Sequence, residues 1–204
     1  MYIAVAGNIG AGKTTLAELL AGQLGFFVHY EAPENNPYII DFYKDMNRWA
    51  FHMQIYLLSN RLNSILKIQE SKKNVIQDRS FYEDAEIFAK ALNQMNILSE
   101  RDYKTYTSLY DNLKKMVQPP DLLIYLKASV ATLVKHISEK KRPYESIRID
   151  YLRTLNILYD KWFENYDLGK KILINVDELD FLENEDHLSE VFNQVNGAIN
   201  GLFS

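Results

Sequence analysis

The segment from Gly7 to Thr14, Gly-Asn-Ile-Gly-Ala-Gly-Lys-Thr, constrains the fold more than any other part of the chain. It matches the phosphate-loop pattern G-x-x-x-x-G-K-[ST] at every fixed position. An apolar run, residues 2–7, leads into it, and a helical pattern, residues 13–24, follows. Glycines let backbone N–H groups turn toward oxyanions, and the positive end of a helix favours the same anion. The sequence therefore predicts a strand–loop–helix unit that binds a nucleoside triphosphate.

Side chains of this loop have the chemistry that phosphate binding requires. Lys13 can neutralise the terminal phosphates, and Thr14 can ligate Mg²⁺. The loop alone does not distinguish a small-molecule kinase from a GTPase or a motor protein. We expect the nucleotide to contact nine residues: Gly7, Asn8, Ile9, Gly10, Ala11, Gly12, Lys13, Thr14 and Thr15.

Short apolar runs alternate with longer helical patterns along the chain, which predicts an α/β fold with a parallel sheet and helices on both faces. The runs that predict strands are residues 2–7, 26–31, 74–78, 121–126 and 171–176. The helical patterns lie near residues 13–24, 36–70 (two helices), 82–94, 99–117, 129–141, 148–166 and 184–200. With 204 residues and no repeat or linker, we expect a single domain over 1–204.

Composition narrows the possible partners and location. The absence of cysteine excludes a disulfide framework and a thiolate metal site. No apolar stretch approaches the roughly 18 residues of a membrane span, and no signal peptide precedes the first strand. A formal net charge of −4 argues against a nucleic-acid polymer as a partner. We therefore expect a cytoplasmic protein that binds neither a membrane nor a nucleic-acid polymer.

Carboxylates close the two predicted strands that follow the phosphate loop. Glu31 ends the second strand, Asp78 ends the third, and Arg79 comes directly after. Ligands of such sheets collect beyond the carboxyl ends of the strands. Phosphoryl transfer to an alcohol needs a base, a metal ligand and cations near the moving group. We expect all three side chains beside the phosphate loop; the alternative is that the carboxylates are solvated strand ends or helix caps.

Two longer segments complete a pattern that resembles a known family. Residues 31–61, EAPENNPYIIDFYKDMNRWAFHMQIYLLSNR, and residues 78–89, DRSFYEDAEIFA, closely resemble the deoxynucleoside kinases, especially the bacterial deoxyadenosine/deoxyguanosine kinases. The likeness extends from residue 1 to about residue 166. It implies a P-loop kinase fold with a five-stranded parallel sheet and a helical lid over about 136–147. It also implies a homodimer that transfers the γ-phosphate of ATP to the 5′-hydroxyl of a deoxynucleoside in nucleoside salvage.

The resemblance assigns roles to individual residues of this chain. Glu31 matches the carboxylate that accepts the 5′-hydroxyl proton, and Arg79 matches the arginine that holds the 5′ oxygen. Lys13 and Arg142 complete the catalytic set that the resemblance implies. Mg²⁺ is expected at Thr14 and Asp78. The residues expected to bind the nucleoside are Glu31, Tyr43, Gln54, Arg61, Arg79, Asp84, Phe88 and Glu145.

Within that set, each side chain has a distinct expected contact. Tyr43 matches the tyrosine on the sugar 3′-hydroxyl, with Glu145 as its partner from the lid. Gln54 matches the glutamine that reads the base edge, and glutamine can form a bidentate pair with adenine N6 and N7. Arg61 and Asp84 match the pair beside that glutamine. Phe88 matches the aromatic ring that stacks on the base, a contact that tolerates any base.

The lid segment 135–146, KHISEKKRPYES, departs from the family pattern of several arginines. His136 stands near the first expected arginine, Lys140 replaces another, and Arg142 is retained. We expect Arg142 and Lys140 to carry the cationic function, although lysine lacks the rigid fork of arginine. The alternative is a solvated basic turn. The family's tryptophan after the catalytic glutamate is also missing here.

Three alternatives stay open on the sequence. The kinase can prefer deoxycytidine or accept deoxynucleosides broadly, because amide and guanidinium groups can reorient. A nucleotide monophosphate kinase can share the scaffold, although Glu31 at the acceptor oxygen disfavours a substrate that already carries two negative charges. A nucleotide-switched regulatory protein needs no acceptor pocket. A purine deoxynucleoside, with deoxyadenosine first, is the favoured substrate.

Overall fold

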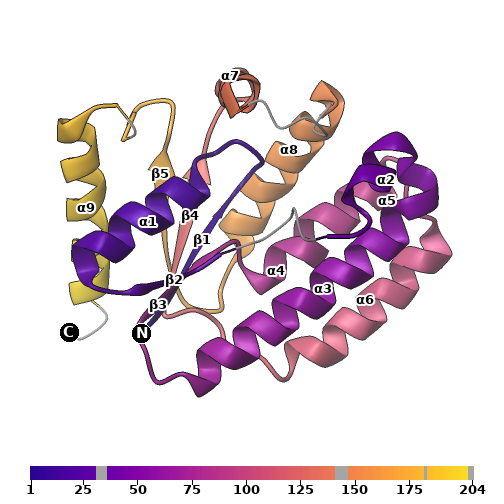
Figure 1. The fold of residues 1–204 in the computed structure, drawn as a ribbon, viewed down its shortest axis with the longest axis horizontal. Helices are drawn as coiled ribbons and strands as arrows, with labels where there is room; N and C mark the ends of the chain where they lie inside the picture. Colours follow the sequence, from indigo (N-terminus) through magenta and orange to yellow (C-terminus); the bar gives the residue numbers. More distant parts are fainter. Residues whose placement is uncertain (31–35, 141–146, 182, 202–204) are drawn as a thin grey trace.

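The computed structural model describes residues 1–30, 36–140, 147–181 and 183–201, and its centre is one parallel sheet (Figure 1). The strand order is β2-β3-β1-β4-β5, and all neighbouring strands are parallel. The strands are β1 (Tyr2–Gly7), β2 (Phe27–His29), β3 (Val75–Asp78), β4 (Leu122–Lys127) and β5 (Lys170–Asn175). The predicted five-stranded sheet is confirmed. Strand β2 is shorter than the predicted 26–31; it lies at one edge of the sheet and pairs with β3.

Helices cover both faces of this sheet, as the pattern predicts. Figure 1 shows α1 and α9 on one side and α3, α6 and α8 on the other. The helical elements are α1 (Lys13–Leu24), α2 (Ile39–Lys44), α3 (Met46–Glu70), α4 (Phe81–Glu83), η2 (Asp84–Ala89), α5 (Lys90–Gln94), α6 (Glu100–Lys114), α7 (Val130–Lys140), α8 (Ile149–Asn165) and α9 (Glu185–Asn200).

Strand β1 separates two hydrophobic cores. Its alternate residues face opposite ways: Ala4 belongs to the core under α3, α6 and α8, and Ile3 and Val5 belong to the core under α1 and α9. All three are fully buried. A strand buried on both faces reads as a continuous apolar run, which is why the pattern of residues 2–7 identifies it. No helix in the described ranges is long and apolar enough to cross a bilayer.

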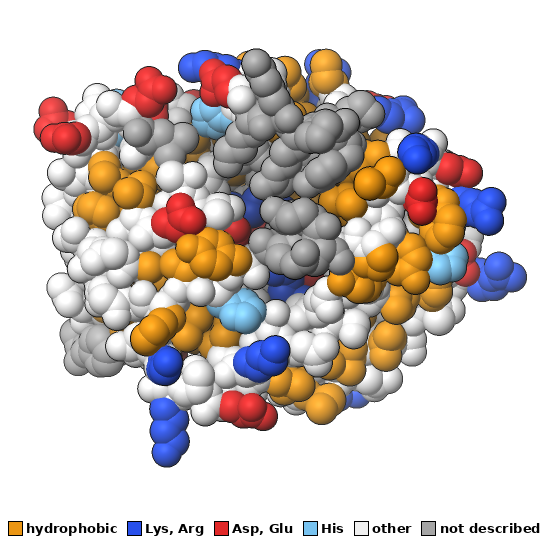
Figure 2. Space-filling model, viewed as in Figure 1, with side chains coloured by type: hydrophobic (Ala, Val, Ile, Leu, Met, Phe, Trp, Pro, Cys, Tyr) orange, Lys and Arg blue, Asp and Glu red, His pale blue; other side chains and the backbone are white. Residues whose placement is uncertain are grey.

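The predicted pair of helices in 36–70 breaks at Asp45. This residue has an extended backbone (φ −146°, ψ 85°), and its carboxylate accepts a hydrogen bond from Arg48 N at 3.2 Å. An aspartate in this position satisfies one of the free N–H groups at the start of α3. Hydrophobic side chains gather on the surface over α2 and α3 (Figure 2), where Ile40 is exposed and the rings of Tyr38 and Trp49 lie 5.8 Å apart.

The predicted helix 82–94 contains a π-helical turn, η2, between α4 and α5. Such turns are rare and often occur at functional sites. This one begins at Asp84 and includes Phe88, two of the residues that the family resemblance assigns to the nucleoside. The short helix before it starts at Ser80, where Ser80 and Glu83 form a capping box.

Candidate active site

The phosphate loop has the predicted strand–loop–helix geometry. Gly10 and Gly12 have φ values of +85° and +91°, in the left-handed region that favours glycine. Lys13 begins α1 and is buried, and its Nζ donates to Asn8 O at 3.0 Å. The lysine therefore folds back over the loop, where its charge is available to phosphate oxygens.

Helix α8 fixes this loop through the Asn8 side chain. Asn8 Nδ2 donates to Leu152 O at 3.1 Å and to Asn156 Oδ1 at 2.6 Å, while Asn8 Oδ1 accepts from Ile9 N at 2.7 Å. Asn156 in turn donates to Ala128 O at 2.8 Å. Because every polar atom of the buried Asn8 side chain is engaged, the loop has a defined position relative to α8.

Two oxygen-bearing side chains meet where β1 and β3 end. Thr14 Oγ1 donates to Asp78 Oδ2 at 2.5 Å, and the Asp78 side chain is 3% exposed. Asp78 Oδ1 is buried without a hydrogen-bond partner in the described part of the chain. Carboxylate and hydroxyl oxygens are ligands that Mg²⁺ prefers, and protein Mg²⁺ sites often use only one or two carboxylates. Among the described residues no cluster of three or more His, Cys, Asp or Glu side chains could hold a metal by itself.

Arg79 reaches the same region from the end of β3. Its φ of +68° is left-handed, which is uncommon for any residue other than glycine. The buried guanidinium lies 4.4 Å from the centroid of the Phe88 ring, within cation–π range. Arg79 Nη1 also donates to Tyr159 OH at 3.1 Å. These contacts place a positive charge at the wall of the cleft, as predicted.

Arg61 and Asp84 form a buried ion pair rather than a solvated one. Arg61 Nε lies 3.2 Å from Asp84 Oδ2, and the side chains are 6% and 1% exposed. Arg61 Nη1 donates to Asp78 O at 3.3 Å and to Arg79 O at 3.2 Å. The arginine therefore supports the backbone at the end of β3 in addition to holding the Asp84 carboxylate.

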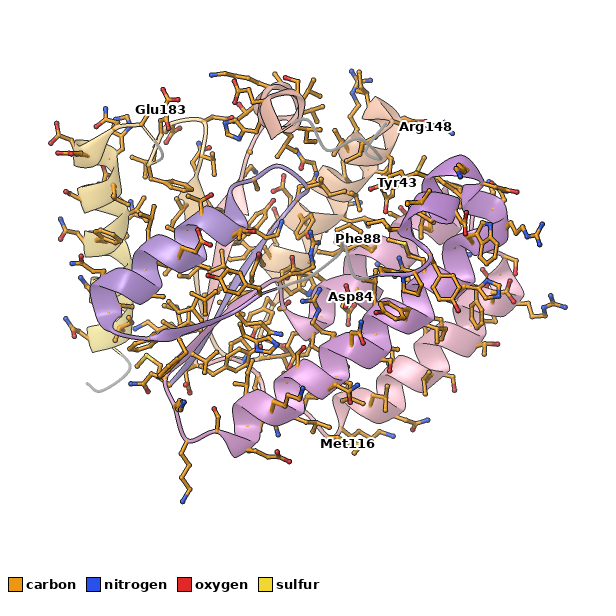
Figure 3. All side chains as sticks on the ribbon, in the orientation of Figure 1. Tyr43, Asp84, Phe88, Met116, Arg148 and Glu183 are labelled. Atoms are coloured by element: carbon orange, nitrogen blue, oxygen red, sulfur yellow. The ribbon has the colours of Figure 1, made fainter. Side chains whose placement is uncertain are left out.

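A cleft of about 1080 Å³, including its part open to solvent, connects the phosphate loop with the helical layer. Its lining includes Lys13, Asp78, Arg79, Gln54, Asp84 and Phe88. Figure 3 shows Tyr43, Phe88 and Asp84 following one another along the space between α8 and α3. Gln54 is 2% exposed, and its Oε1 has no hydrogen-bond partner within the described ranges. A buried amide oxygen without a partner is costly unless a ligand supplies a donor.

Two tyrosines line the end of the cleft nearest α2. Tyr43 belongs to α2, and Tyr151 belongs to the first turn of α8. Burial raises the pKa of Tyr151 above its ordinary value, and the nearby Tyr43 raises it further. Tyr151 is therefore a neutral hydroxyl beside Tyr43, the residue predicted to bind the sugar.

Helix α7, which begins the predicted lid, packs on the phosphate loop. His136 Nδ1 donates to Gly10 O at 2.9 Å, and Ile137 lines the cleft. The packing leaves no space at Gly10, because a Cβ there would lie 2.9 Å from Ile137 Cγ1. His136 thus binds the loop backbone at the place where the family pattern has an arginine.

Several predicted site residues lie outside the described ranges. These are the predicted base Glu31, the lid cation Arg142 and the lid carboxylate Glu145. Helix α7 ends at Lys140, whose side chain is also outside the description. Their assignments remain predictions.

Sequence reasoning missed the side chains that hold the site together. Glu83 is fully buried and accepts hydrogen bonds from three elements, and Tyr159 links it to Arg79. The S-x-x-E spacing of Ser80 to Glu83 is the one local signal for this residue, and it indicates a helix start rather than a centre of contacts. The Asn8–Asn156 contact joins positions far apart in the chain, so no local pattern reveals it.

Fold and site together define a P-loop phosphotransferase with an acceptor cleft beside its phosphate loop. Residues 3–200 match the family model for deoxynucleoside kinases. The chain is 35% identical to a deoxyadenosine/deoxycytidine kinase of Bacillus subtilis, over 97% of this chain and 92% of that protein. It is 38% identical to a deoxyadenosine kinase of Lactobacillus acidophilus, over 95% of this chain and 94% of that one.

Solved structures agree with these matches. The deoxyadenosine kinase from M. mycoides with bound dCTP is 32% identical and superposes with a TM-score of 0.84, covering 97% of this chain and 100% of the other. The same enzyme with dCMP and a flexible dCDP gives a TM-score of 0.86 at 31% identity, with the same coverage. The chain belongs to the deoxynucleoside kinase family, and it is an enzyme that phosphorylates deoxynucleosides with a nucleotide as the phosphate donor.

Proposed function

We propose that this enzyme transfers the γ-phosphoryl group of ATP to the 5′-hydroxyl of a purine deoxynucleoside, with deoxyadenosine as the preferred acceptor. One observation carries the proposal: the cleft beside the phosphate loop reaches Gln54, whose buried Oε1 has no partner in the described part of the chain. This oxygen calls for a donor on the ligand. The 6-amino group of adenine is such a donor, and the Gln54 amide N–H can then donate to N7.

Guanine fits this arrangement less well than adenine. Its O6 is an acceptor, so the Gln54 Oε1, which has no partner in the described ranges, would face another acceptor. The Arg61–Asp84 pair beside the glutamine presents a carboxylate already held by a guanidinium. Phe88 supplies stacking that does not select among bases. We therefore assign the discrimination between adenine and guanine to Gln54 and Asp84.

The proposed sugar contacts follow from the opposite end of the cleft. Tyr43 would contact the 3′-hydroxyl, with Glu145 as its partner from the lid. The position of Tyr43 in the cleft lining supports this role. The Glu145 assignment rests on the family resemblance and lies outside the described residues.

In the proposed transfer, the 5′ oxygen of the nucleoside attacks the γ-phosphorus, and the bond from that phosphorus to the β–γ bridging oxygen breaks. Glu31 takes the hydroxyl proton, Arg79 aligns the attacking oxygen, and the products are a deoxynucleoside monophosphate and ADP. Lys13 and Arg142 balance the negative charge of the moving group. We expect Glu31→Ala to lose most of kcat while ATP affinity, measured by calorimetry, stays near wild type. Normal turnover in this variant removes Glu31 as the base.

Thr14 and Asp78 would hold Mg²⁺, and the buried Oδ1 of Asp78, which has no partner among the described residues, supports that assignment. The ion would neutralise charge on the β- and γ-phosphates. Lid residues Arg142 and Lys140 are proposed to close over the transferred group and to exclude water, which would otherwise compete as acceptor.

Deoxycytidine is the second candidate acceptor. Its 4-amino group can also donate to Gln54 Oε1, so the unpartnered oxygen supports cytosine as well as adenine. The similar protein of Bacillus subtilis is named a deoxyadenosine/deoxycytidine kinase, and the structure of the M. mycoides enzyme has been solved with dCTP bound. Thymine and guanine lack an amino group at the corresponding position.

We also propose a homodimer. Helix α8 exposes the large apolar side chains Ile149 and Ile157, whose accessible fractions are 51% and 56%. A second copy of the chain would remove such side chains from water. Sedimentation equilibrium tests this directly, because the proposal requires twice the mass of one chain, and a monomer at all concentrations contradicts it.

A kinase assay with radiolabelled ATP and each of the four deoxynucleosides tests the proposed function. Deoxyadenosine is expected to give the highest kcat/KM, with deoxycytidine next and deoxyguanosine and thymidine below both. Deoxyadenosine monophosphate, offered in parallel, is expected to remain unphosphorylated. A preference for deoxyguanosine would overturn the base assignment, and phosphorylation of the monophosphate alone would overturn the acceptor assignment.

A further inference from the structure

We infer that Glu83 is a positioning residue that fixes the acceptor-side arginine, Arg79, relative to the phosphate loop. The inference rests on the proposed function, because it concerns how the donor and acceptor halves of that site keep their relative position. Glu83 belongs to α4 and is fully buried behind the cleft wall. It is a carboxylate that the proposed transfer does not itself use.

The Glu83 carboxylate contacts three separate parts of the fold. Oε1 accepts from Gly7 N at 3.2 Å, where β1 passes into the phosphate loop, and from Tyr159 OH of α8 at 2.8 Å. Oε2 accepts from Ser80 N at 2.5 Å, directly after Arg79. One side chain thus joins the start of the donor site to the segment that carries the acceptor-side arginine.

The Arg79 side chain is held by the same group of atoms. Its Nη1 lies 4.0 Å from Glu83 Oε1 and donates to Tyr159 OH at 3.1 Å, so Tyr159 bridges the arginine and the carboxylate. The backbone of Arg79 has φ +68°. Such a conformation persists only where the surroundings over-determine it. The bond from Ser80 N to Glu83 constrains the peptide that follows this residue.

A helix-start role accounts for only part of this arrangement. In a capping box the glutamate accepts from the N-cap backbone, which explains the contact of Oε2 with Ser80 N. It does not require contacts to Gly7 and Tyr159, nor burial of the carboxylate, which is costly without compensating partners. The second oxygen therefore has a role of its own, which is to connect the phosphate loop with Arg79.

The partners of Glu83 predict that glutamine cannot replace it. The N–H groups of Gly7 and Ser80 and the hydroxyl of Tyr159 all donate to the carboxylate. A glutamine has one acceptor oxygen and one NH₂ group. In either amide orientation the NH₂ group would face a backbone N–H, of Ser80 or of Gly7. The isosteric substitution therefore breaks the connection while it keeps the volume.

Three single variants separate positioning from stability. Glu83→Gln breaks the connection at Ser80 or at Gly7, and Tyr159→Phe removes the bridge to Arg79 while the backbone contacts of Glu83 stay in place. Tyr110→Phe is the matched control, because it deletes a buried hydroxyl that donates to Glu86 at 3.1 Å on the outer side of η2. Each is assayed with ATP and deoxyadenosine, with active enzyme counted by burst titration and ATP affinity measured by calorimetry.

Misplacement of reacting groups by about 1 Å can cost on the order of 100-fold in rate, so a loss of about 10- to 100-fold in kcat is expected for Glu83→Gln. Its ATP affinity is expected to fall as well if the NH₂ group faces Gly7 N, which then loses its acceptor. Tyr159→Phe is expected to lower kcat with ATP affinity unchanged, and Tyr110→Phe to leave both unchanged. The double variant Glu83→Gln/Tyr159→Phe is expected to lose no more than Glu83→Gln alone, because both changes act through one connection.

The outcomes separate this inference from the proposed function. A wild-type enzyme that phosphorylates none of the deoxynucleosides refutes the function, whatever the variants do. An active wild type whose Glu83→Gln and Tyr159→Phe variants keep kcat per active site overturns the inference alone, even if their melting temperatures fall. If Glu83→Gln does not fold, Tyr159→Phe decides: a loss of kcat with intact ATP affinity supports the inference, and unchanged kcat overturns it.

Discussion

In the proposed complex, base recognition depends most directly on Gln54. It points into the cleft from α3, it is buried, and its Oε1 lacks a partner in the described part of the chain. A bidentate contact of this kind discriminates by about 1–3 kcal/mol. The cost of an unpartnered oxygen in the free enzyme is offset only when a base with an amino group is bound.

Replacing Gln54 by alanine is therefore expected to reduce use of the nucleoside far more than use of ATP. The expected loss in kcat/KM for deoxyadenosine is about 5- to 150-fold, which corresponds to the loss of about 1–3 kcal/mol. The KM for ATP is expected to stay near wild type. Gln69→Ala, at the far end of α3, is the control with the same chemical change. An unchanged order of preference among the four deoxynucleosides contradicts the assignment of Gln54 to the base.

Asp78 is the corresponding residue beside the phosphate loop, where ATP is expected to bind. One of its oxygens accepts from Thr14, and the other is buried without a partner among the described residues. We expect Asp78→Asn to raise the Mg²⁺ concentration needed for half-maximal activity by roughly ten-fold or more, because a metal-facing carboxylate loses its charge. The measurement is a Mg²⁺ titration at saturating deoxyadenosine. Wild-type Mg²⁺ dependence in this variant would exclude Asp78 as a metal ligand.

At the residue scale, the sequence reveals side chains that belong to short motifs and hides those that connect them. Lys13, Thr14 and Arg79 stand in recognisable local patterns, and the structure brings all three to one cleft. Glu83 and Tyr159 meet only because α4 and α8 pack against the same end of the sheet. Such contacts depend on tertiary packing, which no local spacing encodes.

At the element scale, substitution by alanine is expected to have opposite effects at two glycines, one in the phosphate loop and one in α1. Gly10 has φ +85°, and a Cβ there would meet Ile137 Cγ1 at 2.9 Å and Leu133 O at 3.0 Å, both in α7. Gly22 lies on the exposed side of α1, with no atom within 4 Å of its Cβ position. The first glycine is required by the contact between the loop and the lid helix, and the second is not.

Gly10→Ala is expected to weaken ATP binding and to lower the melting temperature, because it strains the loop and displaces α7. Gly22→Ala is expected to stabilise the protein by about 0.5–1 kcal/mol, since alanine is the better residue inside a helix. Its kcat should equal that of wild type. Thermal melts and ATP calorimetry on both variants check this, and a Gly10→Ala variant with normal ATP affinity would show that α7 does not constrain the loop.

The elements themselves were largely predictable, for a physical reason. Strands β1 and β4 carry continuous apolar runs because they lie inside a sheet that is covered on both faces. The π-turn η2 was not predicted, because a single extra residue in a helical turn leaves the hydrophobic periodicity almost unchanged. The turn carries Asp84 and Phe88, both of which line the cleft.

At the scale of the whole molecule, the alternation of strands and helices predicted the layers of the fold. The shape of the cleft could not be predicted from this alternation. The cleft has walls from the phosphate loop, α1, α2, α3, the end of β3, η2, α7 and α8. Their relative positions depend on long-range contacts such as that of Asn8 with Asn156. The sequence therefore indicated several residues that line the cleft, but the distances between their side chains required the structure.

Because the cleft is built from both layers, ligands are expected to stabilise the whole fold rather than one segment. A ligand at 100 times its dissociation constant adds about 2.7 kcal/mol to the stability of the folded state. For a chain of 204 residues this corresponds to a rise in melting temperature of roughly 5–10 °C. We expect rises of this size with deoxyadenosine alone and with ATP·Mg²⁺ alone.

The variant Gln54→Ala tests whether deoxyadenosine stabilises the fold by binding in this cleft. At one fixed nucleoside concentration, its melting temperature should rise less with deoxyadenosine than that of wild type, and just as much with ATP·Mg²⁺. Thymidine, which has no amino group facing Gln54, should shift wild type and variant equally. Differential scanning fluorimetry measures all six combinations. Equal shifts with deoxyadenosine in both proteins would mean that the nucleoside stabilises the fold from a place other than the cleft that Gln54 lines.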